Sequence, residues 1–111
     1  MYLKFEKSDD KLIVHMIGEL DHHSAEEVRN KIDDRLNQDK ITKLILDFKN
    51  VSFMDSSGIG LIMGRYKNCK MKKGSICISR ATDSIKRVFE LSGIFKIIKI
   101  YDTIEEAVQS I

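Results

Sequence analysis

The chain alternates apolar segments of strand length with segments that carry the helical repeat, and this order restricts its fold more than any other feature. After two strand patterns at Tyr2–Lys7 and Leu12–Ile17, each further strand pattern alternates with one helix pattern. Strands joined by a single helix run parallel in one sheet, because the crossover returns the chain to the same end. The sequence therefore predicts an α/β fold with a mostly parallel sheet.

The predicted elements follow the order β-β-α-β-α-β-α-β-α. A polar turn at Ser8–Asp10 joins the first two strands as a hairpin, and the later strands are predicted at Ile41–Phe48, Ser75–Ser79 and Ile97–Tyr101, with a loop at Lys49–Asp55. Helices are predicted from Ser24, from near Ile59, over Thr82–Leu91 and from Thr103, with capping boxes at Ser24–Glu27 and Thr103–Glu106. This describes one domain over residues 1–111, a mixed five-stranded sheet flanked by four helices.

Composition excludes several classes of protein. Lysine and arginine total 19 against 17 acidic residues, a net charge of +2, which does not suit direct nucleic-acid binding. No apolar run reaches the roughly 20 residues of a membrane span, and the N-terminus lacks a secretory pattern, so we expect a cytoplasmic protein. Cys69 and Cys77 are too few for a disulfide framework or a cysteine-only zinc site, so we expect buried free thiols.

In a parallel sheet the strand-to-helix connections leave from one edge. The connections predicted to meet there are Gly18–Asp21, Phe53–Ser56, Arg80–Thr82 and Asp102–Thr103. Each precedes a helix N-terminus, whose unpaired amides attract anions. We therefore expect a functional site at this edge.

The segment around Asp55, Ser56 and Ser57 is the leading candidate for that site. Each of these side chains can cap the following helix, so a purely structural role is one interpretation. One cap is enough, however, and three candidates leave at least one hydroxyl free to point outward. Such a hydroxyl could be a nucleophile or a phosphate acceptor.

A nucleophile needs a base, and His22 and His23 with Asp21 offer a conceivable Ser-His-Asp constellation. The segment lacks the Gly-x-Ser-x-Gly elbow of a hydrolase, and so short a chain leaves little room for a cleft. Adjacent histidines do not converge on one ion, so no metal site is predicted. A small serine hydrolase thus stays the minor alternative.

Two further patterns favour structural explanations. Gly58, Gly60 and Gly64 have the wrong spacing for a dinucleotide fingerprint, and Gly60 and Gly64 share a helix face suited to close packing on the sheet or to a flat docking surface. The basic cluster consists of Lys67, Lys70, Lys72 and Lys73. It ends a helix without interleaved aromatic residues, which is typical of a solvated face.

Four stretches together resemble the anti-sigma factor antagonists of the STAS domain family. They are Gly18–Glu26 (GELDHHSAE), Phe53–Gly60 (FMDSSGIG), Gly64–Lys67 (GRYK) and Ser92–Ile98 (SGIFKII). The first and last are most similar to the sporulation stage II antagonists of spore-forming bacteria. The resemblance extends over essentially the whole chain, in the same order, and implies a STAS fold.

The resemblance implies a regulatory protein without catalytic activity or cofactor. In this family the unphosphorylated antagonist binds an anti-sigma factor that is also a GHKL-type serine kinase, and so releases a sigma factor for transcription. The kinase phosphorylates the serine after the motif's aspartate, here Ser56, and a PP2C-type phosphatase reverses the reaction. Asp21 matches the docking surface, and Asp55, Ser57 and Gly58 are the further predicted partner contacts.

The residues also supply a mechanism for such a switch. A phosphate adds about −1.5 to −2 charges near neutral pH. At a helix N-terminus the fold tolerates this charge, whereas beside Asp21 and Asp55 it adds negative charge and bulk to a contact surface, so we expect docking to weaken through repulsion and desolvation. Ser57 is a rival acceptor. A STAS-type module that senses a nucleotide or small anion at the same edge is the remaining alternative.

Overall fold

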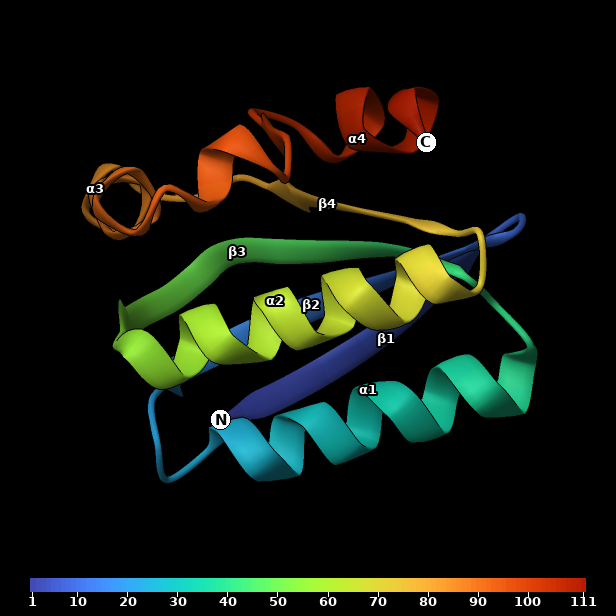
Figure 1. Ribbon diagram of the computed structural model, residues 1–111, viewed down its shortest axis with the longest axis horizontal. Helices are drawn as coiled ribbons and strands as arrows, with labels where there is room; N and C mark the ends of the chain where they lie inside the picture. Colours follow the sequence, from blue (N-terminus) through green and yellow to red (C-terminus); the bar gives the residue numbers. More distant parts are fainter.

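The strands lie in the sheet in the same order as in the chain, β1-β2-β3-β4-β5, in the computed structural model of residues 1–111 (Figure 1). They are β1 (Tyr2–Ser8), β2 (Lys11–Leu20), β3 (Lys43–Met54), β4 (Ser75–Ser79) and β5 (Ile100–Tyr101). β1 pairs with β2 in antiparallel fashion, and all other neighbours are parallel. The predicted mixed, mostly parallel sheet is confirmed.

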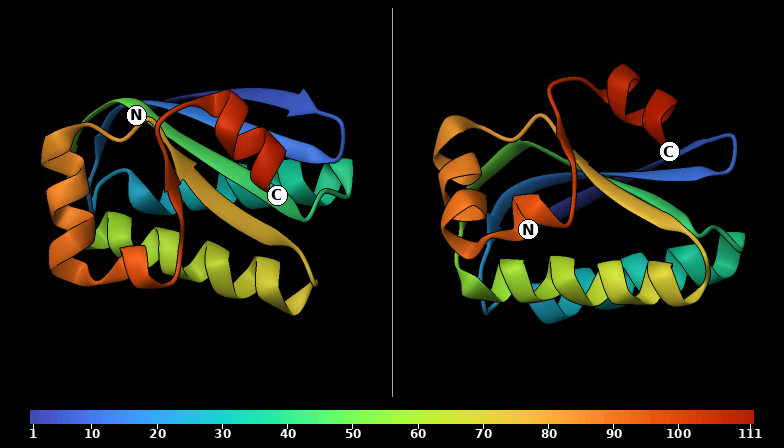
Figure 2. Two further views of the ribbon diagram at one scale, coloured as in Figure 1. Left: turned by 90° about the horizontal axis from the view of Figure 1, so that it is seen from above. Right: turned by 45° about the horizontal axis from the view of Figure 1, so that its top comes forward.

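The helices cover the two faces of the sheet unequally. They are α1 (Ala25–Asp39), α2 (Ser56–Met71), α3 (Asp83–Ser92) and α4 (Ile104–Ser110). α1 and α2 lie side by side on one face with α3 across the end of β3, and α4 lies alone on the opposite face (Figure 2). The main core of 23 buried residues joins α1, α2 and α3 to the sheet, whereas a cluster of four, Ile13, Ile45, Cys77 and Ala107, lies under α4.

Strand β3 is longer than the sequence predicts. Residues Lys49–Met54, predicted as a loop because polar residues interrupt the apolar run, continue the strand and pair with β2 as far as Leu20. β2 likewise continues beyond its predicted end at Ile17. Register shifts between His15 and Ile17 and again between Gly18 and Glu19 accommodate extra residues of β3, so pairing survives the change of pattern.

Strand β5 is shorter than the predicted Ile97–Tyr101 and comprises only Ile100–Tyr101. The preceding residues form a 3-10 turn, η1 (Ile94–Lys96), entered through Gly93 at φ 77°. The amides of Ile97 and Ile98 donate to the carbonyl of Ile94, at 3.0 and 2.9 Å, and are therefore not available to β4. Ile94 and Ile98 are both buried, which explains why this apolar segment coils locally instead of extending.

The two predicted capping boxes have different outcomes. The box at Ser24 is wrong, because the Ser24 hydroxyl makes no cap bond to the helix and instead donates to the Glu19 carbonyl at 2.8 Å. The Thr103 hydroxyl does accept from the Glu106 amide, at 3.1 Å. The Glu106 carboxylate accepts from the Thr103 hydroxyl at 3.3 Å and does not reach the backbone, so this box is half formed.

Cys69 and Cys77 are buried free thiols, as predicted. Burial raises the pKa of both thiols, and that of Cys77 to about 12. Both therefore remain protonated and unreactive at neutral pH. None of the helices combines the length and the apolar character needed to cross a membrane.

Candidate functional site

The strand-to-helix connections form two groups, not the single cluster that the sequence predicts. The loops after β2 and β3 are neighbours, since the Asp55 amide donates to the Leu20 carbonyl at 3.3 Å. The loops after β4 and β5 form the second group, in which the Arg80 amide donates to the Tyr101 carbonyl at 2.9 Å. β4 ends where Ser79 pairs with Asp47, whereas β3 continues to Met54, and this unequal length separates the groups.

Asp55 caps helix α2 and leaves both serine hydroxyls free. Its carboxylate accepts from the Ser57 amide at 2.8 Å, and its backbone is extended, as an N-cap requires. Ser56, the first residue of α2, is exposed, whereas Ser57 is half-buried. Neither hydroxyl forms a hydrogen bond within the chain. The structure thus places Ser56, the more exposed of the two serines, at the first position of the helix.

Asp21 organises the neighbouring loop. Its carboxylate accepts from the amides of His23 and Ser24, at 2.9 and 3.1 Å. Partial desolvation raises the pKa of Asp21, but the two amides and the neighbouring histidines outweigh it and hold the pKa below its ordinary value. Asp21 is therefore ionised at neutral pH, close to the connection that carries Asp55.

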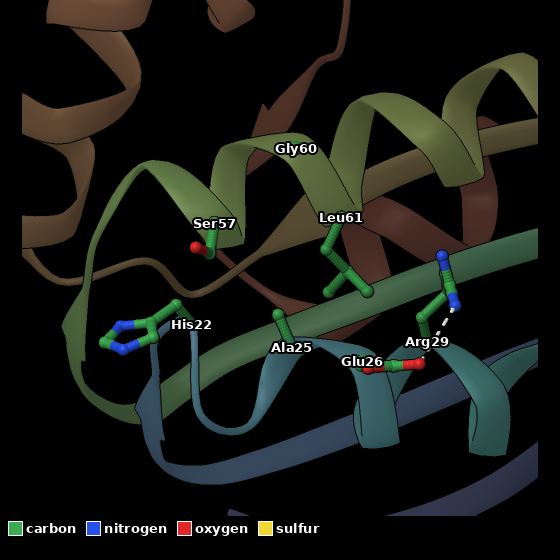
Figure 3. Close-up of a pocket in the computed structure, with 7 residues that line it drawn as sticks. All are labelled: His22, Ala25, Glu26, Arg29, Ser57, Gly60 and Leu61. Carbon is green, nitrogen blue, oxygen red and sulfur yellow. Dashed lines mark ion pairs between the residues drawn. The ribbon is translucent and has the colours of Figure 1, made fainter.

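A shallow pocket of about 470 Å³ separates the first turns of α1 and α2 (Figure 3). The α1 side contributes His22, Ala25, Glu26 and Arg29, and the α2 side contributes Ser57, Gly60 and Leu61. Farther along the helices, Arg65 of α2 donates to Asp33 of α1, which fixes their spacing. Ser57 therefore faces this pocket, whereas Ser56 does not line it.

Gly58 lies inside the fold, not on the exposed side of α2. A Cβ atom added there would lie 2.4 Å from Met54 Cγ and 3.2 Å from Leu20 Cδ2. The absence of a side chain lets the first turn of α2 rest directly on the ends of β2 and β3. Gly58 therefore positions the neighbouring serines and presents no surface of its own to a partner.

Gly60 and Gly64 behave in the opposite way. A Cβ atom at either position would meet no atom within 4 Å, which excludes close packing on the sheet, and the flat docking surface stays a prediction. Gly60 is exposed and borders the pocket. The outward side of α2 is thus smooth beside Ser57.

These opposite environments predict opposite effects of the same substitution. We expect Gly58→Ala to destabilise the protein by about 1–3 kcal/mol through overpacking against Met54. Gly60→Ala is expected to stabilise it by about 0.5–1 kcal/mol, because alanine loses less backbone entropy in a helix. Urea unfolding of both variants measures the difference. Equal effects of the two substitutions would contradict the assignment of Gly58 to a packing role.

Other candidate sites find no support in the geometry. No hydrogen bond joins His22 or His23 to either serine, and the nearest polar contact of His22 is to Asp55, at 3.9 Å. No group of three or more His, Cys, Asp or Glu side chains is arranged to hold a metal ion. In the lysine cluster, Lys70 donates to the Tyr66 hydroxyl and Lys72 to the Asn37 side chain, both exposed contacts.

Comparison with known proteins decides the family. The STAS domain family matches residues 2–107. The chain belongs to the STAS domain family. An anti-sigma F factor antagonist from Paenibacillus polymyxa is 38% identical to this STAS domain over 102 residues, which cover 92% of this chain and 87% of the relative. The resemblance that the sequence motifs indicate is confirmed.

Solved structures of STAS proteins have the same fold. A putative anti-sigma factor antagonist from Thermotoga maritima superposes with a TM-score of 0.91 at 26% identity, covering 96% of this chain and 92% of that one. The anti-sigma factor antagonist SpoIIAA in its unphosphorylated form gives 0.76 at 30% identity, covering 99% and 100%. SpoIIAA of Bacillus in its phosphorylated form gives 0.75 at 32% identity, covering 97% of each chain.

This STAS domain also contains a charged cluster that the sequence analysis missed. Buried Asp47 accepts from Arg80 Nε and Nη2, at 3.0 and 2.6 Å, and lies 2.6 Å from His15 Nδ1. His15 Nε2 lies 2.9 Å from Glu6 Oε1, so the cluster links β1, β2, β3 and the end of β4. The available signal was an aspartate within the apolar run Leu44–Phe48.

Proposed function

We propose that this protein is an anti-sigma factor antagonist controlled by phosphorylation of Ser56. The unphosphorylated form binds an anti-sigma factor that is also a GHKL-type serine kinase, and the bound sigma factor is released for transcription. A PP2C-type phosphatase restores the active form. Residues 1–111 act as one cytoplasmic switch domain without enzymatic activity.

The exposure of the Ser56 hydroxyl is the observation that carries this proposal. A kinase must reach the acceptor oxygen, and Ser56 is exposed at the start of α2 with no hydrogen bond to break. Ser57 is half-buried between α1 and α2, and its amide is held by Asp55. The similarity to SpoIIAA, solved in phosphorylated and unphosphorylated forms, supports the same kind of switch.

The proposed docking surface combines the two neighbouring loops with the first turns of α1 and α2. Asp21 and Asp55 supply carboxylates whose Oδ1 atoms accept from loop amides, while their Oδ2 atoms lie 3.9 Å from Nδ1 of His23 and of His22, respectively. Ser57 contributes through the pocket, and Gly60 keeps the adjacent helix surface flat. Gly58 acts indirectly, by seating the first turn of α2 on the sheet.

The choice of acceptor is tested by phosphorylation of two variants. With the cognate kinase and ATP, we expect Ser57→Ala to gain one phosphate and Ser56→Ala to gain none, because Ser56 is the more exposed of the two serines. Intact-mass spectrometry followed by peptide mapping locates the modification. Phosphate on Ser56→Ala would transfer the role to another residue. Binding of both unmodified variants to the kinase is the control that each retains its docking surface.

A further inference from the structure

Strand β1 has a free edge along its whole length. It is the outer strand of the sheet and pairs only with β2, through continuous register from Tyr2 with Ile17 to Ser8 with Lys11. No segment runs alongside its outer side, and α1 lies beneath the sheet (Figure 2). Alternate amides and carbonyls of such an edge have no partner within the chain, so the edge is a template for another strand.

Features that normally block an edge strand are few in β1. The chain contains no proline, and β1 has no bulge in its pairing with β2. The strand at the opposite edge, β5, has only two residues and is too short to pair with another chain, whereas β1 has seven. Charged side chains are the remaining feature of β1 that can prevent pairing with another strand, so their pattern decides which strand the edge can bind.

We propose that two copies of this chain associate through antiparallel pairing of their β1 strands, centred on Phe5. In this register Phe5 lies opposite Phe5 of the second copy, and the whole of Tyr2–Ser8 is paired. Lys4 lies opposite Glu6 of the second copy, and by symmetry Glu6 lies opposite its Lys4. Opposite charges in directly facing positions stabilise a strand pair, so this register is complementary.

The same charges disfavour the neighbouring registers. A pair centred on Lys4 would place the two Lys4 side chains opposite each other, and a pair centred on Glu6 would oppose the two glutamates. Like charges in facing positions are destabilising. A two-fold axis perpendicular to the sheet must centre on a residue, so among the registers centred on Lys4, Phe5 and Glu6 the charge pattern selects Phe5, which is also the register that pairs all of Tyr2–Ser8.

The side chains that form this contact are available in the single chain. Lys4 is exposed and has no ion-pair partner. Glu6 uses Oε1 toward His15, and its Oε2 has no partner. Phe5 lies on the other face, where the Arg35 guanidinium is 5.3 Å from its ring. Lys4 and Glu6 therefore project together from the face opposite α1.

Analytical ultracentrifugation of the full chain tests the association. A single pair of edge strands buries little surface, so we expect weak association in which the average mass rises from 12.8 kDa toward twice that value as the protein approaches about 1 mM. A mass that stays at that of one chain over this range overturns the proposal.

Charge reversal tests the register. Lys4→Glu and Glu6→Lys each place like charges opposite each other in a self-pair, so each variant alone is expected to lose association by at least about 10-fold. Mixed together, the two variants place glutamates opposite lysines at both positions. We therefore expect the mixture to form a heterodimer that neither variant forms alone.

Two controls separate this result from misfolding and from general charge effects. Thermal unfolding of each variant shows whether it is folded, which matters because Glu6→Lys also removes the contact to His15. Lys67→Glu makes the same change in charge at an exposed position on α2 and should leave the association unchanged. Failure of the mixed variants to pair, or equal loss with Lys67→Glu, overturns the β1 register.

Discussion

A negative charge on Ser56 is expected to weaken binding to the anti-sigma factor about 100-fold, a change of about 2.7 kcal/mol. The loss follows from the surroundings of Ser56, since Asp55 precedes it and the Asp21 loop is adjacent. A phosphate adds about two negative charges to a surface that must be desolvated when the partner docks, and this desolvation costs binding free energy. Isothermal titration of phosphorylated and unmodified protein against the partner measures the difference.

The fold itself should tolerate this charge. Ser56 is the first residue of α2, where the helix dipole and free amides favour an anion by about 0.3–1 kcal/mol. We therefore expect Ser56→Asp to melt at or slightly above the temperature of the unmodified protein. The switch then acts by repulsion at the docking surface and needs no change of fold.

Two matched variants isolate the effect of position and of charge. Ser84→Asp adds the same charge in the first turn of α3, at an exposed position next to the second group of loops, and should bind as the unmodified protein does. Ser56→Asn adds similar bulk without charge and should retain most of the affinity. If phosphorylated protein and Ser56→Asp bind with undiminished affinity, the proposed switch is wrong.

The order of the elements and the type of sheet could be predicted, because the spacing of apolar residues along the chain distinguishes strands from helices directly. The boundaries that the sequence missed share one cause, which is that tertiary pairing overrides local pattern. Lys49 and Asn50 look like a loop, yet β2 continues alongside them and the strand persists through two register shifts. Ile97 and Ile98 look like a strand, yet their amides are used in the turn after Gly93.

The candidate site could be predicted to the level of the residue cluster but not of its geometry. Asp55, Ser56 and Ser57 are adjacent in sequence, so their shared location follows from one strand-to-helix junction. Which serine is exposed depends on how the first turn of α2 packs on the sheet, where a side chain at Gly58 would clash with Met54. The role of Asp47 was beyond prediction, because its partners lie 32 and 33 residues away in the chain.

Asp47→Asn is expected to be the most destabilising polar substitution, with a loss of about 2–4 kcal/mol at pH 7. The Asp47 side chain is 3% exposed and balances Arg80 and His15, so a neutral amide would leave these donors without their charged acceptor. Urea unfolding gives the loss. Asp102→Asn is the matched control, because the Asp102 side chain is 80% exposed and its contact with Lys86 should contribute less than about 0.5 kcal/mol.

The pH dependence distinguishes the charge of Asp47 from its shape. Burial raises the pKa of Asp47, but Arg80 and His15 outweigh burial and hold it below the ordinary value of 3.8. The ionised Asp47 therefore stabilises the folded state at pH values above 3.8. As the pH falls below 3.8, the unfolded chain binds the proton before the folded chain does, and this stabilisation decreases until the pH is below the pKa of the folded state. The difference in unfolding free energy between unmodified protein and Asp47→Asn should therefore narrow from about pH 5 to pH 2.5. A difference that stays constant over this range would show that the carboxylate charge does not stabilise the sheet.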